Sequence, residues 1–420
     1  MSMQIAKLEQ ELERAKRSVA TTPQFLDLRV QKNGEDKILA TIDNLRALMD
    51  HYGIEARYNL IHKRVYVSGL SCLPGEEENT LYAEMLSRAA LHGLPIQGMT
   101  PYLERIAQQN AYNPVTDWLD SLNPLPGNPI PRFVQHCGFT QREWAEIACR
   151  RWFIQAVAAA DYGKHSDNSL ARPEFPYVLV LAGDQGLTKT SLMYDLLPAQ
   201  VRDCFTAGRM LDTSKKDSIF EAIKNWIVEL GEIDSTFRKS DIAALKAFLT
   251  KQVDDVRLPY AKTWSHMPRR TCYMATVNQL KFLQDATGNR RFWPLVIVQK
   301  ISPIQQNLAE AIWAWAWSEY KAGEQWWLTP EEEQLHAQIV AGHEDRPIKE
   351  RILDCYDFTS DNRNVLITST EVFKEIGWSA ADRSASTTLG ITLNSMGIER
   401  DESRRVYRMP PRTSSNGYNL

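Results

Sequence analysis

Apolar positions recur at helical spacing in the first third of the chain. This spacing predicts amphipathic helices over residues 42–52, 80–92, 98–110 and 141–160. Between the first two of them, two short alternating runs, at 55–59 and 64–69, predict a β-hairpin. The first part of the chain is therefore expected to be mainly helical.

The pattern changes at residue 177. Short apolar runs of strand length then alternate with helical segments up to about residue 300, and helical spacing returns over 304–342. Alternation of this kind is typical of a parallel sheet covered by helices. We therefore predict an α/β core that follows a helical N-terminal region.

Residues 346–411 predict a small separate block. A helix around 346–356 is followed by the strings VLITSTEVFKEIGW and SASTTLGITLNSMGI, and then by a short strand, RVYRMP. Three helices followed by a wing strand is the order of a winged-helix domain, which binds duplex DNA or protein. Contact with DNA is favoured by four arginines: Arg383, Arg404, Arg405 and Arg408.

The two ends of the chain predict less structure. Residues 4–17 carry apolar positions at heptad spacing, which predicts either a surface helix or a self-association helix. Residues 20–37 are polar and predict a linker, and the tail from Pro411 predicts disorder. A proline-rich stretch at 121–133 predicts a boundary. The resulting segments are 1–37 (helix and linker), 38–135 (N-terminal α+β or helical domain), 136–343 (α/β domain), 344–411 (winged-helix-like domain) and 412–420 (tail).

Composition narrows the class of protein. The chain has 420 residues, of which 43% are hydrophobic, enough for more than one core. It lacks both a run of about 18 apolar residues and a signal-peptide core, so we expect no membrane span. The cysteines are scattered without a CxxC pair, which argues against a zinc site of the usual spacing and favours a reducing, cytoplasmic location. With a net charge of −3, any nucleic-acid binding must come from local basic groups or from a ring that gathers them.

The strongest motif is YVLVLAGDQGLTKTS, residues 177–191. A buried strand runs into a glycine-containing turn and then a helix, which is the context of a phosphate-binding P-loop. Backbone N–H groups of such a loop point at phosphate oxygens, while Lys189 would reach the β- and γ-phosphates of ATP and Thr190 would hold Mg²⁺. The predicted nucleotide-binding residues are Gly183, Asp184, Gln185, Gly186, Leu187, Thr188, Lys189, Thr190 and Ser191.

Thr188 departs from the P-loop pattern, which has glycine at this position. If the position needs a positive φ, a β-branched residue there is costly. If it lies in the helical region, the change is harmless.

Two later segments predict further parts of an ATPase site. KNWIVELGEID (224–234) reads as a buried strand that ends in acids, and Glu229 or Glu232 would act on magnesium or on the attacking water. The metal ligands are thus expected to be Thr190 and Glu229. RTCYMATVNQ (270–279) reads as another strand, and Asn278 at its end would sense the γ-phosphate. Taken alone, each of these could be an ordinary strand end.

Arg290 and Arg291 precede a further strand in TGNRRFWPLVI. An arginine that reaches the γ-phosphate of a neighbouring subunit accelerates hydrolysis strongly. A surface salt bridge is the alternative reading of the pair.

The segment between these motifs predicts the contact with nucleic acid. VRLPYAKTWSHMPRR reads as a hairpin with Lys262 near its tip and Trp264 beside it. A basic group suits phosphate and a ring stacks on a base, so this pairing favours single-stranded nucleic acid. The candidate contacts are Arg257, Lys262, Trp264, Arg269 and Arg270.

The strings AGDQGLTKTS, WIVELGEID, ATVNQ and FLQDATGNRRFWPL resemble the virulence-associated E proteins, superfamily 3-like AAA+ helicases of phages and other mobile elements. The motifs cover about 170–300, with weaker similarity near the start and in the C-terminal block. The resemblance implies a homo-hexameric ATPase with a site between subunits, formed by Lys189, Thr190, Glu229 or Glu232, Asn278 and Arg290 or Arg291. It also implies that Lys262 grips DNA. The first 150 residues contain no primase-like acid cluster, so priming is not expected.

Three functional hypotheses follow. The first is an ATP-dependent helicase and replication initiator that moves single-stranded DNA through a ring. The second is a nucleic-acid-triggered ATPase switch without unwinding, for example in defence against phage. The third is a non-hydrolysing origin-binding or assembly factor, in which Thr188 prevents turnover. Strand displacement and ATP hydrolysis discriminate between them.

Overall fold

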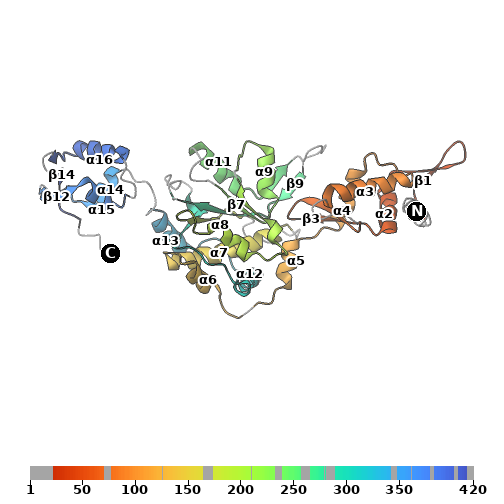
Figure 1. Ribbon diagram of the computed structural model, residues 1–420, viewed down its shortest axis with the longest axis horizontal. Coiled ribbons are helices and arrows are strands. Elements are labelled where there is room, and N and C mark those ends of the chain that lie inside the picture. The colour runs from red at the N-terminus through yellow and green to blue at the C-terminus, as the bar shows by residue number, and fades with distance from the viewer. Residues whose placement is uncertain are drawn as a thin grey trace, which may run out of the picture. The chain divides into compact units, whose positions relative to one another are not determined.

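The computed structural model describes residues 22–70, 77–124, 126–163, 174–209, 211–231, 239–256, 265–278, 280, 289–341, 348–360, 362–378, 383–401 and 405–413. The chain divides into two units (Figure 1). The first comprises residues 1–279 and 290–335, and the second comprises 280–289 and 336–420. Among the described residues, no helix is both long and apolar enough to cross a membrane. The predicted helix over 4–17 lies outside the described residues.

A five-stranded parallel sheet forms the core of the first unit. Its strands are β5 (Val178–Ala182), β6 (Phe205–Arg209), β7 (Ile227–Leu230), β10 (Cys272–Val277) and β11 (Phe292–Val296). Their order across the sheet is β11-β5-β10-β7-β6, and every pair is parallel. β5 and β7 are buried at every position, which explains their continuous apolar runs. The α/β prediction is confirmed.

Helices surround this sheet (Figure 1). They are α5 (Pro114–Ser121), α6 (Ile130–Cys137), α7 (Arg142–Asp161), α8 (Lys189–Leu196), α9 (Lys216–Ile223), α11 (Lys239–Leu249) and α12 (Gln306–Lys321), with a 3-10 turn at Arg202–Cys204. Helix α13 (Pro330–Ala341) and the 3-10 turn Asn289–Arg291 each include residues of both units. α7 packs on α5, α6 and α12 and is buried along most of its length. The indole N–H groups of Trp152 and Trp313 donate to the carbonyls of Tyr273 and Leu196, so these rings fill the core with their polar atoms satisfied.

An N-terminal module, defined here as described residues 22–110, has its own hydrophobic core. It contains α2 (Ile42–Tyr52), the hairpin β3 (Glu55–Asn59) and β4 (Arg64–Ser68), α3 (Glu77–Leu91) and α4 (Met99–Gln109). α2 begins at Thr41, whose side chain accepts from the N–H of Asn44, and ends at Gly53 with φ +63°. These elements agree with the expected pattern.

The predicted linker at 20–37 is wrong in part. Residues Leu28–Val30 (β1) and Asp36–Ile38 (β2) form an antiparallel hairpin. Its turn contains Asn33 and Gly34, and the Asn33 side chain accepts from the N–H of Glu35. Since almost every residue of both strands is exposed, no apolar alternation revealed them.

A second hairpin joins β8 (Val253–Val256) to β9 (Ser265–Pro268). Its two strands agree with the hairpin expected near the basic segment. The predicted tip, residues 257–264, lies outside the described residues.

The second unit contains α14 (Ile348–Cys355), β12 (Val365–Thr368), α15 (Ser369–Glu375), α16 (Arg383–Ser395), β13 (Arg400–Asp401) and β14 (Val406–Met409). The strands form an antiparallel sheet of order β12-β14-β13 around one hydrophobic cluster. Three helices precede the β14 strand, as expected, and two further strands pair with it. Thr368 and Glu371 form a capping box at the start of α15.

Part of the predicted disordered tail is ordered. Arg412 pairs with Tyr356 in a β-bridge, and its guanidinium donates to the Glu375 carboxylate at 2.6 Å. The backbone N–H of Thr413 donates to Cys355. These contacts fix residues 411–413, whereas residues 414–420 lie outside the described residues.

Candidate nucleotide-binding site

The loop after β5 forms the P-loop predicted from the sequence. β5 ends at Ala182, and α8 begins at Lys189. Gly183 has φ +156°, and a Cβ on it would lie 2.4 Å from the carbonyl oxygen of Ile297. Any larger residue would therefore push the loop away from β11. Gly186 has φ +88° and open space around it, so here the backbone conformation selects glycine.

Thr188 occupies the left-handed region, with φ +61° and ψ +29°. The chain therefore adopts the positive φ that the sequence analysis identified as costly for a β-branched residue. This conformation raises the free energy of a residue with a Cβ by roughly 1–2 kcal/mol. The Thr188 hydroxyl lies 2.6 Å from the carbonyl oxygen of Leu187 and 2.7 Å from that of Ile301. These contacts hold the strained residue in place and tie the loop to the segment after β11.

Lys189 is held across the mouth of this loop. Its ammonium donates to the carbonyl oxygens of Gly183 at 2.6 Å and Asp184 at 2.8 Å. These contacts place the positive charge inside the ring of backbone that would surround a phosphate.

Glu229 lies at the centre of a buried polar network. Its side chain is 2% exposed, and one carboxylate oxygen accepts from the hydroxyls of Thr190 at 2.7 Å and Thr276 at 2.6 Å. The other oxygen accepts from the backbone N–H of Gly208 at 3.2 Å. The network exists because β10 lies between β5 and β7, which brings Thr276 between the P-loop and the acid.

Thr276 was not predicted. A threonine in the run MATV reads as an ordinary strand former, since β-branched residues favour strands. Only the order of the strands shows that its hydroxyl faces Glu229.

A cavity of about 680 Å³ opens over this network. Its lining combines the P-loop with the carboxyl ends of the neighbouring strands, including Asn278 after β10 and Gly208 near the end of β6. Ligands in open α/β sheets bind at this edge of the strands. The structure therefore brings together Lys189, Thr190, Glu229 and Asn278, while Glu232 lies outside the described residues.

The paired oxygens of Thr190 and Glu229 fit a magnesium ion. Mg²⁺ prefers oxygen ligands and is usually held by one or two protein groups together with substrate phosphates. A hydroxyl and a carboxylate oxygen 2.7 Å apart beside the loop provide such a pair.

Arg290 and Arg291 lie at the opposite edge of the sheet. They precede β11, whose first residue pairs with Val178 at the start of β5, whereas the P-loop follows Ala182 at the end of β5. At roughly 3.3 Å per residue, the strand separates the two edges by about 16 Å. Burial, and then the neighbouring Arg290, lowers the pKa of Arg291. Neither arginine can reach the P-loop of its own chain.

The predicted nucleic-acid residues divide into two groups. Arg257, Lys262 and Trp264 lie outside the described residues. Arg269 and Arg270 are 1% and 5% exposed. Arg269 forms a buried ion pair with Asp254 and donates to the carbonyl of Phe248. The expectation that these two arginines face a DNA strand is therefore not supported, because each would first have to leave the protein interior.

Residues 128–345, more than half of the chain, match the virulence-associated protein E-like domain. The chain belongs to this family. The virulence-associated protein E-like domain covers the P-loop, Glu229, Asn278 and the two arginines before β11, whereas the N-terminal module lies outside it.

Solved structures titled as the NrS-1 C-terminal region also align with this virulence-associated protein E-like chain. One apo form is 12% identical with a TM-score of 0.42, covering 88% of this chain and 99% of that chain. Another, of residues 305–718, is 13% identical with a TM-score of 0.40, covering 87% of this chain and 98% of that chain. No curated protein matches the chain.

Proposed function

We propose that this chain is an ATP-driven motor that acts on DNA and hydrolyses ATP at sites shared between neighbouring copies in a ring. The observation that carries the proposal is the separation of the site's two halves. The P-loop, Thr190 and Glu229 lie at one edge of the sheet, and Arg290 and Arg291 lie at the other. Copies arranged head to tail would place the arginines of one against the P-loop of the next, and repeated contacts of this kind close into a ring.

The candidate site residues have separate roles in this proposal. The P-loop N–H groups and Lys189 bind the phosphates of ATP, after the ammonium exchanges its loop carbonyls for phosphate oxygens. Thr190 and Glu229 hold Mg²⁺, which neutralises phosphate charge when bound. Thr276 fixes the orientation of Glu229, and Asn278 contacts the terminal phosphate. Glu232 remains the second candidate for activating water.

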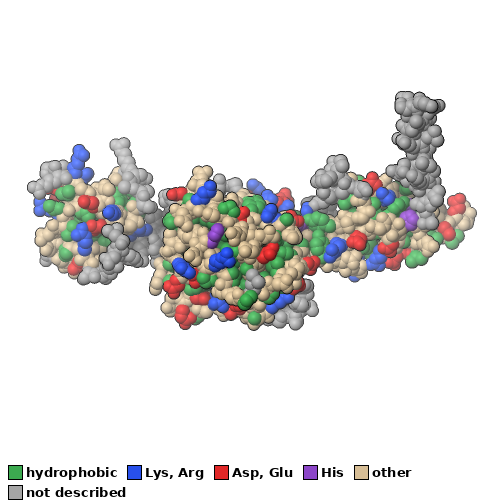
Figure 2. Space-filling model, turned by 60° about the horizontal axis from the view of Figure 1, so that its bottom comes forward, with side chains coloured by type: hydrophobic (Ala, Val, Ile, Leu, Met, Phe, Trp, Pro, Cys, Tyr) green, Lys and Arg blue, Asp and Glu red, His purple; other side chains and the backbone are tan. Residues whose placement is uncertain are grey.

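The proposed contact with DNA depends on assembly. On the face shown in Figure 2, the Lys and Arg side chains of the described residues are interspersed with Asp and Glu and form no single basic patch. A ring would concentrate the hairpin residues Lys262 and Trp264 of every copy around one strand, which compensates for the acidic chain. Such a motor fits replication of a phage or mobile element, with a homo-hexamer as the proposed assembly.

Thr188 supports a second candidate function, that of a nucleotide-binding assembly factor without turnover. A Cβ at φ +61° and a hydroxyl bonded to Ile301 make this loop stiffer than one with glycine. If the loop cannot adjust around the γ-phosphate, nucleotide would bind and hold the assembly without being cleaved.

ATP hydrolysis with and without single-stranded DNA separates the two functions. The motor predicts turnover that DNA accelerates, and its loss in Lys189→Ala but not in the exposed control Lys37→Ala. Bound nucleotide without turnover in the assembled protein would contradict the motor and favour the assembly factor. If turnover is present, displacement of a strand from a forked duplex distinguishes a helicase from a DNA-triggered switch.

A further inference from the structure

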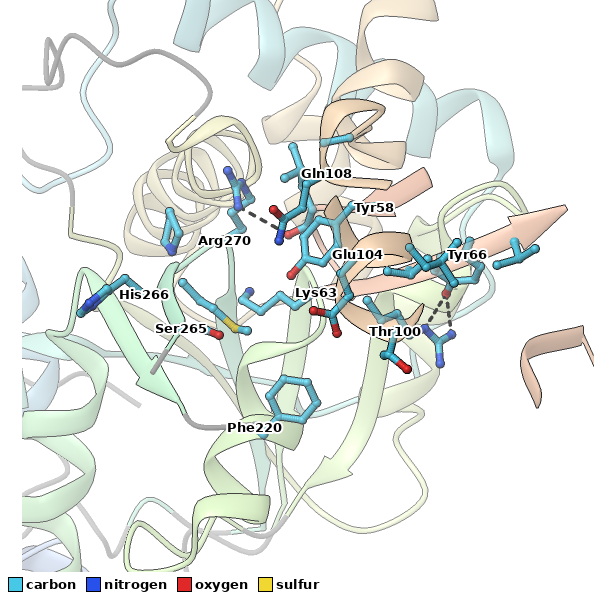
Figure 3. A pocket seen from close by; sticks show the side chains of 18 of the residues that line it. Tyr58, Lys63, Tyr66, Thr100, Glu104, Gln108, Phe220, Ser265, His266 and Arg270 are labelled. Carbon is cyan, nitrogen blue, oxygen red and sulfur yellow. Dashed lines mark hydrogen bonds between the residues drawn. The ribbon is translucent and has the colours of Figure 1, made fainter. Parts of the chain in front are cut away.

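A second cavity, of about 770 Å³, lies within the first unit between the N-terminal module and the ATPase core (Figure 3). β3, β4 and α4 form one side, and α9 and β9 form the other. Side chains of both sides point into it, among them Tyr58, Lys63, Glu104, Phe220 and Arg270. A volume of this size suits a small molecule.

Two buried cations line this cavity without a carboxylate partner among the described residues. Lys63 is 3% exposed, and its ammonium donates to the carbonyl oxygen of Ile223 at 2.6 Å. Arg270 is 5% exposed, its one hydrogen bond reaches the carbonyl of Leu60 at 3.5 Å, and its Nε has no acceptor. Buried charges are normally paired, because an uncompensated one loses several kcal/mol of hydration.

Other buried arginines of this chain are paired. Arg269 forms its ion pair with Asp254, and Arg151 binds the carboxylates of both Glu324 and Glu332. Glu104 lines the same cavity as Lys63 and Arg270, yet it forms no ion pair with either among the described residues. In this cavity two buried cations thus have no carboxylate in direct contact among the described residues, and Asp254 and Asp161 act on Lys63 and Arg270 only from a distance.

Aromatic side chains complete the lining. Tyr58 and Tyr66 come from the hairpin of the N-terminal module, and Phe220 comes from α9. Figure 3 shows Tyr58 and Phe220 on either side of the Lys63 side chain. Rings of this kind stack on planar ligands.

We infer that this cavity binds a small anion carrying an aromatic ring, of the chemical class of a nucleoside monophosphate. The anionic group lies between Lys63 and Arg270, and the ring packs among the aromatic side chains. Such a ligand would bind the N-terminal module to the ATPase core, because each side of the cavity supplies one of the two cations.

This site is separate from the proposed ATP site. Arg270 precedes β10, and Lys63 contacts the end of α9, which leads into β7. The cavity therefore lies toward the amino ends of β7 and β10, whereas the P-loop cavity opens at the carboxyl ends of the same sheet. The inference does not depend on ATP hydrolysis.

Calorimetric titration of adenosine 5′-monophosphate tests the site, in full-length protein carrying Lys189→Ala so that the P-loop is impaired. Lys63→Met added to this background removes one charge at nearly constant size. In this variant the Ile223 carbonyl still accepts a hydrogen bond from the Thr271 hydroxyl at 3.2 Å, so the substitution leaves no buried acceptor unsatisfied. Lys37→Met is the matched control, since Lys37 is exposed on β2.

We expect one equivalent to bind, with an affinity that falls at least about tenfold in Lys63→Met and is unchanged in Lys37→Met. Adenosine lacks the phosphate group and inorganic phosphate lacks the aromatic ring. Both should therefore bind at least about tenfold more weakly than the monophosphate. Absence of saturable binding, equal affinities in the two methionine variants, or equal binding of adenosine would each overturn the inference. None of these results bears on turnover at the P-loop.

The pH dependence gives a second readout. Burial lowers the pKa of Lys63 to about 7, with Arg270 and Arg269 lowering it further and Asp254 opposing them. The other titratable or charged side chains that line the cavity are Glu104 on α4, Tyr82 on α3, His266 on β9, and Tyr58, Arg64 and Tyr66 of the β3–β4 hairpin. A bound anion favours the protonated amine, so affinity should fall as pH rises from 7 to 9, where a phosphate with a second pKa of about 6 is already ionised. In Lys63→Met this fall should disappear, and a fall of equal size would count against a role for the amine.

Discussion

At the scale of single residues, Thr188 decides how this P-loop differs from others. Its backbone adopts a conformation that favours glycine, and its hydroxyl secures the conformation through Leu187 and Ile301. The sequence identified the substitution but could not choose between its two consequences, since φ at a loop position depends on contacts distant in the chain. Here the distant contact is with Ile301, which lies 113 residues away.

Thr188→Gly and Thr188→Ala separate strain from hydrogen bonding. Both lose the hydroxyl, but only alanine keeps a Cβ at positive φ. We expect the glycine variant to be more stable than the alanine variant by about 1 kcal/mol, measured as a difference in urea unfolding. Equal stabilities, or a more stable alanine variant, would show that the strain is absent.

Motif residues were predictable at this scale, and buried polar residues were not. The motif spacing placed Lys189, Thr190 and Glu229 in one predicted site, and the structure brings them together around one cavity. Thr276 was missed because its role depends on strand order. Arg269 and Arg270 were assigned to DNA because a basic dipeptide after a hairpin looks exposed, and only packing reveals that both are buried.

At the scale of elements, buried polar contacts hold the β8–β9 strand pair to the core. Arg269, just after β9, forms its buried pair with Asp254 on β8 and donates to the last turn of α11 at Phe248. The guanidinium also lies 4.1 Å from the centre of the Phe248 ring. These contacts fix the base of the hairpin whose tip is proposed to touch DNA.

Arg269→Met should destabilise the protein by about 3–5 kcal/mol, because it leaves the Asp254 carboxylate buried without its partner. Adding Asp254→Leu should recover much of this loss. The free energy of unfolding of the two variants provides the measurement. If Arg269→Met instead keeps its stability and loses only DNA affinity, the arginine is a DNA contact after all.

Element types followed the apolar pattern closely, and departures have a common cause. The helices of the N-terminal module and the strands of the central sheet each bury one face or both, so their period is visible in the sequence. Nearly every side chain of β1 and β2 is exposed, so their sequence shows no apolar periodicity. Arg412 and Thr413 looked like a disordered tail because backbone pairing with α14 leaves no sequence signal.

At the scale of the whole molecule, the second unit is proposed as a further place where DNA binds. Arg405, just before β14, and Arg408 on β14 are exposed, while Tyr407 and Met409 of β14 are buried in the core of this unit. This alternation directs the arginines away from the core. The predicted arginine Arg404 lies outside the described residues, as does the side chain of Arg383.

Arg408→Ala should weaken duplex binding uniformly across sequences, with the slope of log affinity against log salt reduced by about 0.9. Fluorescence anisotropy over a range of salt concentrations measures this slope. Arg132→Ala, which removes an exposed arginine from α6 in the first unit, serves as the control. An unchanged slope in Arg408→Ala would show that Arg408 on β14 does not contact DNA.

If each ATP site is built from two copies of the chain, mixing two inactive variants restores complete sites. Lys189→Ala and Arg290→Ala are each expected to abolish hydrolysis, as is Arg291→Ala if that arginine is the one used. The two kinds of variant are mixed before assembly, and hydrolysis is measured in the presence of single-stranded DNA. A mixed ring contains some interfaces with an intact P-loop facing an intact arginine, so activity should return on mixing. Mixtures as inactive as their components, in rings shown to contain both variants, would contradict a shared site.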